Sequence, residues 1–378
     1  MQQSSSLYIH IPFCRTKCTY CDFNSYAGLE ELFDDYVTAL VREMEKASPA
    51  RARTIYAGGG TPTVLPLSHL TQILDAARST FVVDSDAEIS IEANPGTVEA
   101  ERLAGLRALG VNRLSLGVQS FDDGELRLLG RIHTAAEAVR AFHAARQVGF
   151  DNVNLDLIYG LPGQSLASWQ ATLEHALALQ PDHLSLYALT VEKGTPLAVT
   201  IAQGDLADPD PDLAAEMYES AEARLSTAAY VHYEISNWAK ESEFQCQHNL
   251  TYWRNELYLG IGAGAHSWDG QRRWANAAHP ADYTARILSR DSPVVEEESI
   301  GSALEMGETM MMGLRLLNEG VGYERFRERF GVDLRQRFAG ELAELTDLEL
   351  VETDAERVRL SERGRLLGNQ AFLRFLPE

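Results

Sequence analysis

Cysteines are few in this chain of 378 residues, and it has no long apolar run. Only four cysteines are present, and three of them lie within the first 21 residues. An odd group of three does not suit the disulfide framework of a small secreted protein, and no apolar export signal precedes it. No apolar run approaches the about 20 residues of a membrane-spanning helix. We therefore expect a protein of the reducing cytoplasm without a transmembrane segment.

Positive charge is also scarce. Lys and Arg total 33 against 55 Asp and Glu, which gives a formal net charge of −22 at pH 7. Nucleic-acid affinity is built largely from clustered cations that neutralise phosphates, so we expect no nucleic-acid partner. Transient contact with a membrane surface stays open, although the charge gives it no support. The hydrophobic fraction of 45% is enough for a sizeable core in one large domain with a smaller one.

The three early cysteines are the most informative residues of the chain. Cys14, Cys18 and Cys21 have the spacing Cys-x3-Cys-x2-Cys. Three thiolates so close together can hold three irons of a [4Fe-4S] cluster and leave the fourth iron open to a substrate or cofactor. The spacing therefore favours an iron–sulfur cluster.

Zinc is an alternative. A structural zinc ion takes four ligands, and Cys246 or His10 would complete the set. Inert buried thiols are a poorer interpretation, because the residues between the first two cysteines, Arg15, Thr16 and Lys17, are typical of a solvated loop. The spacing alone leaves zinc open beside the cluster.

The first 200 residues alternate short β-rich runs with amphipathic segments. The clearest amphipathic segment, residues 29–44, has apolar residues spaced three to four apart, which predicts a helix with one apolar stripe. Six β–α repeats predict an α/β fold with a parallel sheet, and because a closed barrel needs eight, we expect an open partial (β/α)6 barrel. The expected strands are residues 7–13, 54–58, 88–93, 113–118, 153–159 and 183–189.

Residues suited to binding lie at the ends of several of these strands. The carboxyl ends of parallel strands meet at one rim, so we expect the side chains there, with the cysteine loop after the first strand, to form one active face. The rim residues are Gly59, Gly60, Thr61, Glu92, Gln119 and Asp156.

The chain divides into three parts on this interpretation. We assign residues 1–240 to the barrel, residues 241–299 to a loop region and a charged linker, and residues 300–378 to a smaller, mostly helical C-terminal domain. A short hairpin near the end gives the last domain a winged-helix-like pattern. Its crowded aspartates and glutamates argue against contact with DNA.

The cysteine spacing, an aromatic residue before the third cysteine, and the Gly-Gly-Gly-Thr-Pro segment at 58–62 together resemble the radical S-adenosylmethionine (SAM) superfamily. The resemblance implies that the open iron binds the amino and carboxylate groups of SAM. It further implies that one electron from the cluster cleaves the sulfonium and gives a 5′-deoxyadenosyl radical. The glycines would let the backbone approach the charged end of SAM without a Cβ between them.

The same resemblance implies the contacts to SAM residue by residue. Tyr20 offers a face or edge to the adenine, and Arg131 pairs with the carboxylate. Glu92 and Asp156 accept hydrogen bonds from ribose hydroxyls or an ammonium group. Tyr8 matches a SAM-contacting tyrosine of one subfamily.

Further segments, at 6–14, 116–121, 154–162 and 233–237, resemble the oxygen-independent coproporphyrinogen III oxidase family. That family has two branches: dehydrogenases that decarboxylate two propionates of a porphyrinogen, and radical SAM heme chaperones. Dehydrogenases carry a further cysteine two positions after the third, where this chain has Phe23, and a long segment before the cluster motif. Both differences favour the chaperone branch.

A third feature, His-Asn-Leu-Thr-Tyr-Trp at 248–253, is similar to the His-Asn-x-x-Tyr-Trp motif of the heme chaperones. The resemblance implies a protein that binds heme, passes it to hemoproteins such as those of the respiratory chain, and forms a homodimer. Neutral imidazole is a common heme ligand, so we expect His248 to bind the iron, ahead of His266 and Cys246. The alternative is an oxygen-independent coproporphyrinogen III dehydrogenase.

Overall fold

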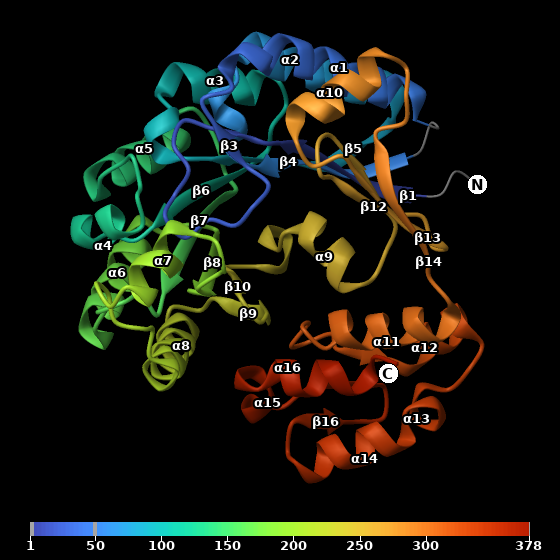
Figure 1. The fold of residues 1–378 in the computed structure, drawn as a ribbon. Helices are drawn as coiled ribbons and strands as arrows, with labels where there is room; N and C mark the ends of the chain where they lie inside the picture. The colour runs from blue at the N-terminus through green and yellow to red at the C-terminus, as the bar shows by residue number, and fades with distance from the viewer. Residues whose placement is uncertain (1–3, 48–50, 378) are drawn as a thin grey trace.

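The computed structural model describes residues 4–47 and 51–377, and its largest feature is a twelve-stranded sheet (Figure 1). Six consecutive strands in the middle of this sheet are parallel and confirm the predicted partial barrel. They are β1 (Ser4–Ile11), β4 (Arg51–Gly59), β5 (Val82–Ala93), β6 (Arg113–Gln119), β7 (Val153–Tyr159) and β8 (His183–Ala188). Beyond β8 the sheet ends in an antiparallel hairpin of β10 (Asn237–Ala239) and β9 (Val231–Glu234).

Helices connect the parallel strands and cover the outer face of the sheet (Figure 1). The predicted amphipathic helix is α1 (Phe33–Lys46), whose stripe of Tyr36, Val37, Leu40 and Met44 is buried. Strand β6 is buried at nearly every position, as expected for a parallel strand covered on both faces. The other main helices of this part are α2 (Leu67–Thr80), α3 (Ala100–Ala108), α5 (Ala135–Gln147), α6 (Leu166–Leu179) and α8 (Pro211–Thr227).

The prediction of a loop and linker at 241–299 is wrong for much of this range, because four more strands extend the sheet beside β1. The first is parallel to β1 and the others are antiparallel to one another. The last strand carries three glutamates and is mostly exposed at the sheet edge, so it lacks the apolar pattern that marks a covered strand. These strands are β11 (Tyr258–Ile261), β12 (His266–Trp268), β13 (Arg272–Asn276) and β14 (Val294–Ser299).

A short helix, α9 (Gln247–Trp253), lies between the barrel and the C-terminal domain (Figure 1). We expected a loop at this position. The structure has a helix, because the Glu88 carboxylate on β5 accepts hydrogen bonds from the backbone N–H groups of Gln247 and His248, at 3.0 and 3.1 Å. N–H groups in a first helical turn have no partner inside the helix, so this carboxylate stabilises its start.

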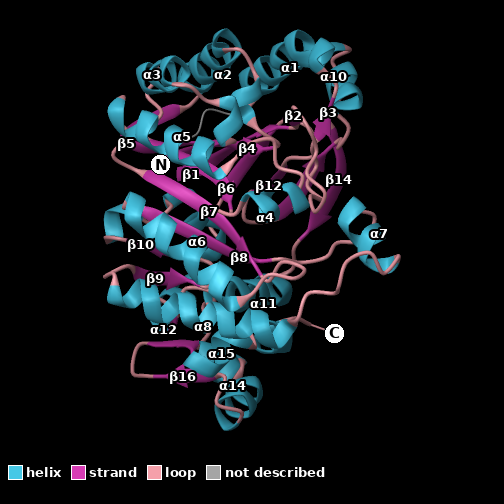
Figure 2. Ribbon diagram, turned by 90° about the vertical axis from the view of Figure 1, so that its left-hand side faces the viewer, coloured by secondary structure: helices cyan, strands magenta, loops and turns pink. Residues whose placement is uncertain are grey.

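The C-terminal part has an apolar core of its own, and Figure 2 shows it at the lower end of the molecule. A three-stranded sheet in the order β15-β17-β16 packs with helices, in agreement with the winged-helix-like pattern. Ion pairs join this part to the rest of the chain: Arg315 pairs with Glu234 of the sheet, and Glu319 pairs with Arg254 at the end of α9. Its elements are α11 (Ser302–Gly313), β15 (Val321–Gly322), α12 (Tyr323–Phe330), α13 (Leu334–Arg337), α14 (Ala339–Asp347), β16 (Val351–Thr353), β17 (Arg357–Leu360), α15 (Glu362–Leu366) and α16 (Gly368–Phe372).

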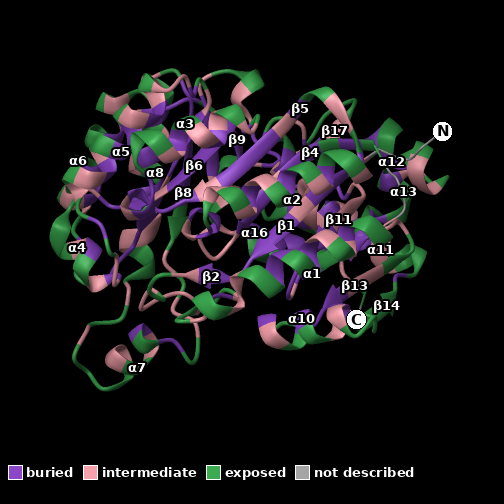
Figure 3. Cartoon of the chain, turned by 90° about the horizontal axis from the view of Figure 1, so that it is seen from above, coloured by how far each residue is buried: buried purple, intermediate pink, exposed green. Residues whose placement is uncertain are grey.

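The strands of the barrel are the most buried part of the molecule (Figure 3). In contrast, α7 (Pro196–Ala202) stands away from the body on its loop (Figure 3). Its Leu197 N–H donates a hydrogen bond to the Thr19 carbonyl at 2.9 Å, so this projection rests against the cysteine loop. In the part of the chain that the structure describes, we find no helix with the length and apolar character needed to cross a membrane.

Candidate functional site

The cysteine loop is fixed at both ends. β2 (Phe13–Cys14) pairs in parallel with β3 (Tyr26–Ala27), which closes the loop just beyond the carboxyl end of β1. Within the loop the Cys21 N–H donates to the Cys18 carbonyl at 3.3 Å. Cys14, Cys18 and Cys21 are all partly exposed, and none of them forms a disulfide with another described residue.

Each of the three thiols has a polar neighbour. Cys18 Sγ accepts a hydrogen bond from Arg131 Nη1 at 3.3 Å. Cys14 Sγ lies 3.6 Å from Thr61 Oγ1, and Cys21 Sγ lies 3.7 Å from a serine hydroxyl. Three thiols with supporting polar groups and a free side toward a cavity are a donor set that fits an iron–sulfur cluster.

A cavity of about 490 Å³ lies in front of the thiols, and we name it the cysteine cavity. Its size is within the range of cofactor and small-molecule sites. The wall contains all three cysteines, every rim residue expected from the sequence, and two of the three further residues expected to contact SAM. These residues are Cys14, Cys18, Cys21, Tyr20, Gly59, Gly60, Thr61, Glu92, Gln119, Arg131 and Asp156.

The two residues considered as a fourth zinc ligand lie outside this wall. Cys246 is fully buried, with Sγ 3.7 Å from Glu88 Oε1. The His10 ring has both nitrogens engaged, Nδ1 at 2.9 Å from the Tyr8 hydroxyl and Nε2 at 2.9 Å from the Asn24 carbonyl. Neither residue stands beside the three thiols, so the arrangement favours a cluster with an open iron.

Gly59 and Gly60 let the end of β4 approach the cysteine loop. A Cβ on Gly60 would lie 2.6 Å from the Phe13 carbonyl oxygen. Gly59 has a φ of +112°, and a Cβ there would lie 2.4 Å from the His10 ring, so only glycine fits both positions. Thr61 N–H then donates to the Phe13 carbonyl at 2.8 Å. We expected these glycines to make room for SAM. In the structure they make room for the start of the cysteine loop.

Two partly buried carboxyl groups, those of Glu92 and Asp156, line the cysteine cavity. Glu92 accepts hydrogen bonds from the Tyr56 hydroxyl at 2.7 Å and from Gly59 N–H at 3.1 Å. Burial raises the pKa of Glu92 to about 7. Asp156 accepts from the Ser115 hydroxyl at 3.0 Å and from an asparagine amide at 2.8 Å, and burial raises its pKa as well. Such carboxyl groups change charge readily when a ligand arrives.

Arg131 and Gln119 are both constrained. Arg131 Nη2 donates to the Gly117 carbonyl at 2.6 Å, while its buried Nε has no hydrogen-bond partner among the described residues. Gln119, the last residue of β6, has a φ of +69°, which is uncommon outside glycine. Strain of this kind concentrates at functional sites, so both residues remain candidates for contact with a ligand.

Sequence analysis missed residues that line the cysteine cavity from inside the strands. Tyr56 and Ser115 hold the two carboxyl groups, and the side chain of Tyr187 forms another part of the wall. Side chains along a strand alternate between faces, and Ser115, Gly117 and Gln119 lie two positions apart along the same wall. Counting back from Gln119 in steps of two reaches Gly117 and then Ser115.

Tyr8 lies outside the cysteine cavity, in a neighbouring hollow of about 430 Å³ that we name the histidine hollow. The structure therefore does not bring Tyr8 together with the cysteines as expected. Three residues line both spaces: Phe23, Gly59 and Glu92. The full lining of the histidine hollow is Tyr8, His10, Phe23, Asn24, Gly59, Glu92, Tyr252, Tyr258, Gly264 and His266.

His248, the expected heme ligand, lies behind the wall of the histidine hollow and lines neither space. Its side chain is 1% exposed. Nδ1 lies 2.8 Å from Thr54 Oγ1 and Nε2 lies 3.0 Å from the Tyr252 hydroxyl, while the ring stacks on Tyr56 with centroids 5.0 Å apart. Burial lowers the pKa of His248 to about 3, so the imidazole is neutral. In this arrangement a metal could bind either nitrogen only by displacing one of these hydrogen bonds, so ligation of heme iron by His248 stays a prediction.

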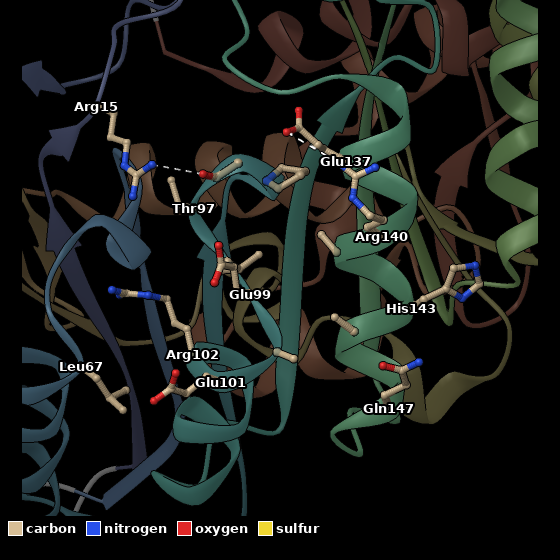
Figure 4. Close-up of a pocket in the computed structure, with 16 residues that line it drawn as sticks. Arg15, Leu67, Thr97, Glu99, Glu101, Arg102, Glu137, Arg140, His143 and Gln147 are labelled. Carbon is tan, nitrogen blue, oxygen red and sulfur yellow. Dashed lines mark hydrogen bonds and ion pairs between the residues drawn. The ribbon is translucent and has the colours of Figure 1, made fainter.

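A third hollow, of about 910 Å³, lies on the outer side of the barrel between α3 and α5 (Figure 4). Arg15 of the cysteine loop reaches its edge and donates from Nη1 to the Gly96 carbonyl at 3.3 Å (Figure 4). The other charged side chains around it are arginines and glutamates in mixture. None of the described residues that line it was expected in the site, so it stays outside the candidate site.

Comparison with known proteins agrees with this geometry. Residues 8–176 match the model of the radical SAM superfamily, and residues 305–367 match that of the HemN C-terminal domain. The chain is 39% identical to heme chaperone HemW of Bacillus subtilis over 99% of both chains. It is 46% identical to heme chaperone HemW of Escherichia coli over 69% of both chains.

A mouse relative and a solved structure extend the comparison. The mouse protein, radical S-adenosyl methionine domain-containing protein 1, mitochondrial, is 35% identical over 99% of this chain and 88% of its own. The solved structure, coproporphyrinogen III oxidase (HemN) from Escherichia coli, has a TM-score of 0.84 and 26% identity, covering 99% of this chain and 90% of its own. From the fold, the site and these similarities, the chain belongs to the radical SAM family that includes the proteins named heme chaperone HemW in Bacillus subtilis and Escherichia coli.

Proposed function

We propose that this protein is a heme chaperone that carries a [4Fe-4S] cluster with SAM, binds heme and delivers it to hemoproteins, including those of the respiratory chain. The observation that carries the proposal is the pair of adjoining spaces. One is walled by three thiols, the other by aromatic side chains and histidines, and three residues belong to both. The name shared by the curated relatives supports heme as the cargo.

For the cluster and SAM, the proposal assigns the cysteine cavity. Cys14, Cys18 and Cys21 would hold three irons, and a bound cluster with SAM would supply one-electron cleavage of the sulfonium. Arg131 carries a positive charge beside Cys18 and is suited to the SAM carboxylate. Tyr20 would contact the adenine.

The remaining wall residues would orient SAM. Glu92 and Asp156 are positioned to accept hydrogen bonds from ribose hydroxyls or the ammonium group. The strand-end segment with Gly59, Gly60 and Thr61 offers its backbone, and the strained Gln119 offers an amide. The position of these residues in the cavity wall and the superfamily match support these proposed roles.

A titration with heme tests the central claim. Anaerobically reconstituted protein is titrated with heme, and the absorbance change is followed to saturation. The loaded protein is then mixed with an apo-hemoprotein, and transfer is followed through the acceptor's own spectrum. We expect saturable binding and transfer. An absence of saturable heme binding contradicts the proposal.

The second candidate is an oxygen-independent coproporphyrinogen III dehydrogenase. The similarity to the solved coproporphyrinogen III oxidase, with a TM-score of 0.84, is the observation in its favour. Against it stands Phe23, which occupies the position where a further cysteine is expected in dehydrogenases. Anaerobic incubation with SAM, a reductant and coproporphyrinogen III separates the two. Catalytic release of protoporphyrinogen IX and carbon dioxide would favour the dehydrogenase.

We also propose where the protein acts, in the cytoplasm, and how it assembles, as a homodimer. All four cysteines are unpaired, which supports a reducing cytoplasm, with transient contact at a membrane when heme is delivered. We further propose a homodimer, as the family resemblance implies. Sedimentation of the cluster-loaded protein tests this, and a single monomeric species would contradict it.

A further inference from the structure

The histidine hollow has the lining that a flat, conjugated ligand requires. Four aromatic side chains, those of Tyr8, Phe23, Tyr252 and Tyr258, form much of its wall. Phe23 is 66% exposed, which is unusual for a large apolar side chain next to a cavity. Aromatic rings of this kind gain stability by stacking on a ligand of similar shape.

Three histidines lie in or beside this hollow, and an iron ligand needs a ring nitrogen with a free lone pair. His10 is buried and uses both nitrogens, one toward Tyr8 and one toward Asn24. His248 is buried and uses both nitrogens, one toward Thr54 and one toward Tyr252. Neither imidazole can bind iron without first losing a hydrogen bond in the interior.

His266 is the exception. It is the first residue of β12, its side chain is exposed, and it lines the histidine hollow. Over residues 4–47 and 51–377 no side chain or backbone group forms a hydrogen bond with its ring. Both nitrogens therefore face the hollow or solvent without a protein partner.

We propose that His266 supplies the axial nitrogen to heme iron in the histidine hollow, and that His248 acts as a positioning residue by holding Tyr252 in the wall. The inference rests on the proposed function as a heme carrier, and it moves the ligand from the expected histidine to another. Bond formation is the donation of one imidazole lone pair to the iron, so no oxidant or reductant is consumed.

The positioning role of His248 follows from its contacts. Nε2 engages the Tyr252 hydroxyl at 3.0 Å, and the two rings meet edge to face with centroids 5.1 Å apart. Tyr252 in turn meets Tyr258 edge to face at 4.8 Å. Removal of His248 would loosen the aromatic wall and lower heme affinity without removing the ligand.

The test compares three single variants with the unchanged full-length protein, each titrated with heme and examined by absorbance and resonance Raman spectroscopy. In H266G we expect loss of the iron–imidazole signals and their return when free imidazole is added. In H248A we expect those signals to remain, with affinity lower by about tenfold, as for residues that support a metal ligand. H143A, which changes an exposed histidine on the outer side of the barrel, is expected to match the unchanged protein.

The outcomes distinguish a failure of the His266 assignment from a failure of the proposed heme-binding function. If H266G keeps the unchanged spectrum, or if H248A loses the iron–imidazole signals and imidazole restores them, then the assignment of His266 is wrong while the heme function stands. If the unchanged protein shows no saturable heme binding, then both the function and the ligand assignment fall.

Discussion

The cysteine cavity and the histidine hollow share three residues, yet they are built in opposite ways. The wall of the cysteine cavity comes from strand ends that follow one another along the chain, from Cys14 to Glu192. The histidine hollow joins β1 and the cysteine loop to the segment 252–266, because β11 pairs in parallel with β1. Consecutive β–α units make the first space, whereas the second exists only when distant segments pair.

The donor atoms of the two spaces also differ in what they already bind. The thiols of Cys14 and Cys18 have contacts of 3.6 and 3.3 Å with their neighbours, and hydrogen bonds to sulfur are weaker than those to oxygen or nitrogen. The nitrogens of His10 and His248 are held at 2.8 to 3.0 Å. Residues that are free to bind a metal can thus be told from residues that hold the wall by the hydrogen bonds they already make.

Removal of one thiol from the cysteine cavity should give the largest effect. In Cys18→Ala the two cysteines left cannot hold three irons, so we expect complete loss of the cluster. Iron, acid-labile sulfide and absorbance after anaerobic reconstitution measure this. Cys246→Ala is the matched control, because its thiol is buried outside the cavity. Full iron content in Cys18→Ala, or equal loss in both variants, would contradict the assignment of the ligands.

The approach of β4 to the cysteine loop is tested by Gly60→Ala. The added Cβ would meet the Phe13 backbone at 2.6 Å, so we expect the free energy of unfolding to fall by about 3 kcal/mol, in the upper part of the usual range for overpacking. Gly340→Ala in α14 is the control, since nothing lies within 4 Å of its added Cβ and alanine favours a helix. Thermal unfolding measures both. Equal stability of the two variants would show that β4 does not approach this closely.

The Glu92 carboxyl, which lines both spaces, predicts a pH dependence of stability. Burial raises the pKa of Glu92 from 4.5 to about 7. Between these values the unfolded carboxyl is ionised while the folded one keeps its proton, so stability falls as pH rises through this window and is level above it. Glu92→Gln should remove the share of this loss that Glu92 causes, on the order of 3 kcal/mol, and make the unfolding free energy less dependent on pH between 4.5 and 7.

A second carboxyl provides the comparison for Glu92. The pKa of Glu43 is also raised to about 7 by burial, but this residue lies on α1, outside both spaces. Glu43→Gln should also make the unfolding free energy less dependent on pH in this window, without changing the affinity for SAM or heme. If Glu92→Gln leaves the pH profile of unfolding unchanged, its carboxyl is ionised in the folded chain.

The smallest effect is expected from Tyr252→Phe. The substitution keeps the ring but leaves His248 Nε2 without its partner at 3.0 Å, which should cost about 1 kcal/mol of unfolding free energy. A double-mutant cycle with His248→Leu isolates the contact, because the two effects are additive only where the residues do not interact. A coupling energy of zero would mean that His248 does not hold Tyr252.

The parts that sequence analysis predicted share a local signal. The six parallel strands, the stripe on α1 and the cysteine cavity all follow from spacing within a few neighbouring residues. The incorrect prediction of a linker also has a local cause. The three glutamates of β14 are typical of a solvated segment, and only the pairing with β13 makes this segment a strand.

No local signal in the sequence indicated that His248 would be buried with both ring nitrogens hydrogen-bonded. The residue that engages its Nδ1, Thr54, lies 194 positions earlier in the chain, and the start of α9 depends on Glu88, 160 positions before His248. A histidine in a polar stretch is exposed or buried according to which distant strand it meets. Only the folded arrangement distinguishes it from His266, which lies 18 positions farther along the same chain.

Gly59 and Glu92 line both the cysteine cavity and the histidine hollow. Binding of a ligand in one space can therefore change the affinity of the other space for its ligand. If a ligand in the cysteine cavity alters the protonation or position of Glu92 and thereby changes the affinity of the histidine hollow by some factor, the reverse effect must have the same factor. Cooperativity between SAM and heme would therefore be measurable from either side. A protein that releases its cargo when SAM binds must equally lose SAM when the cargo returns.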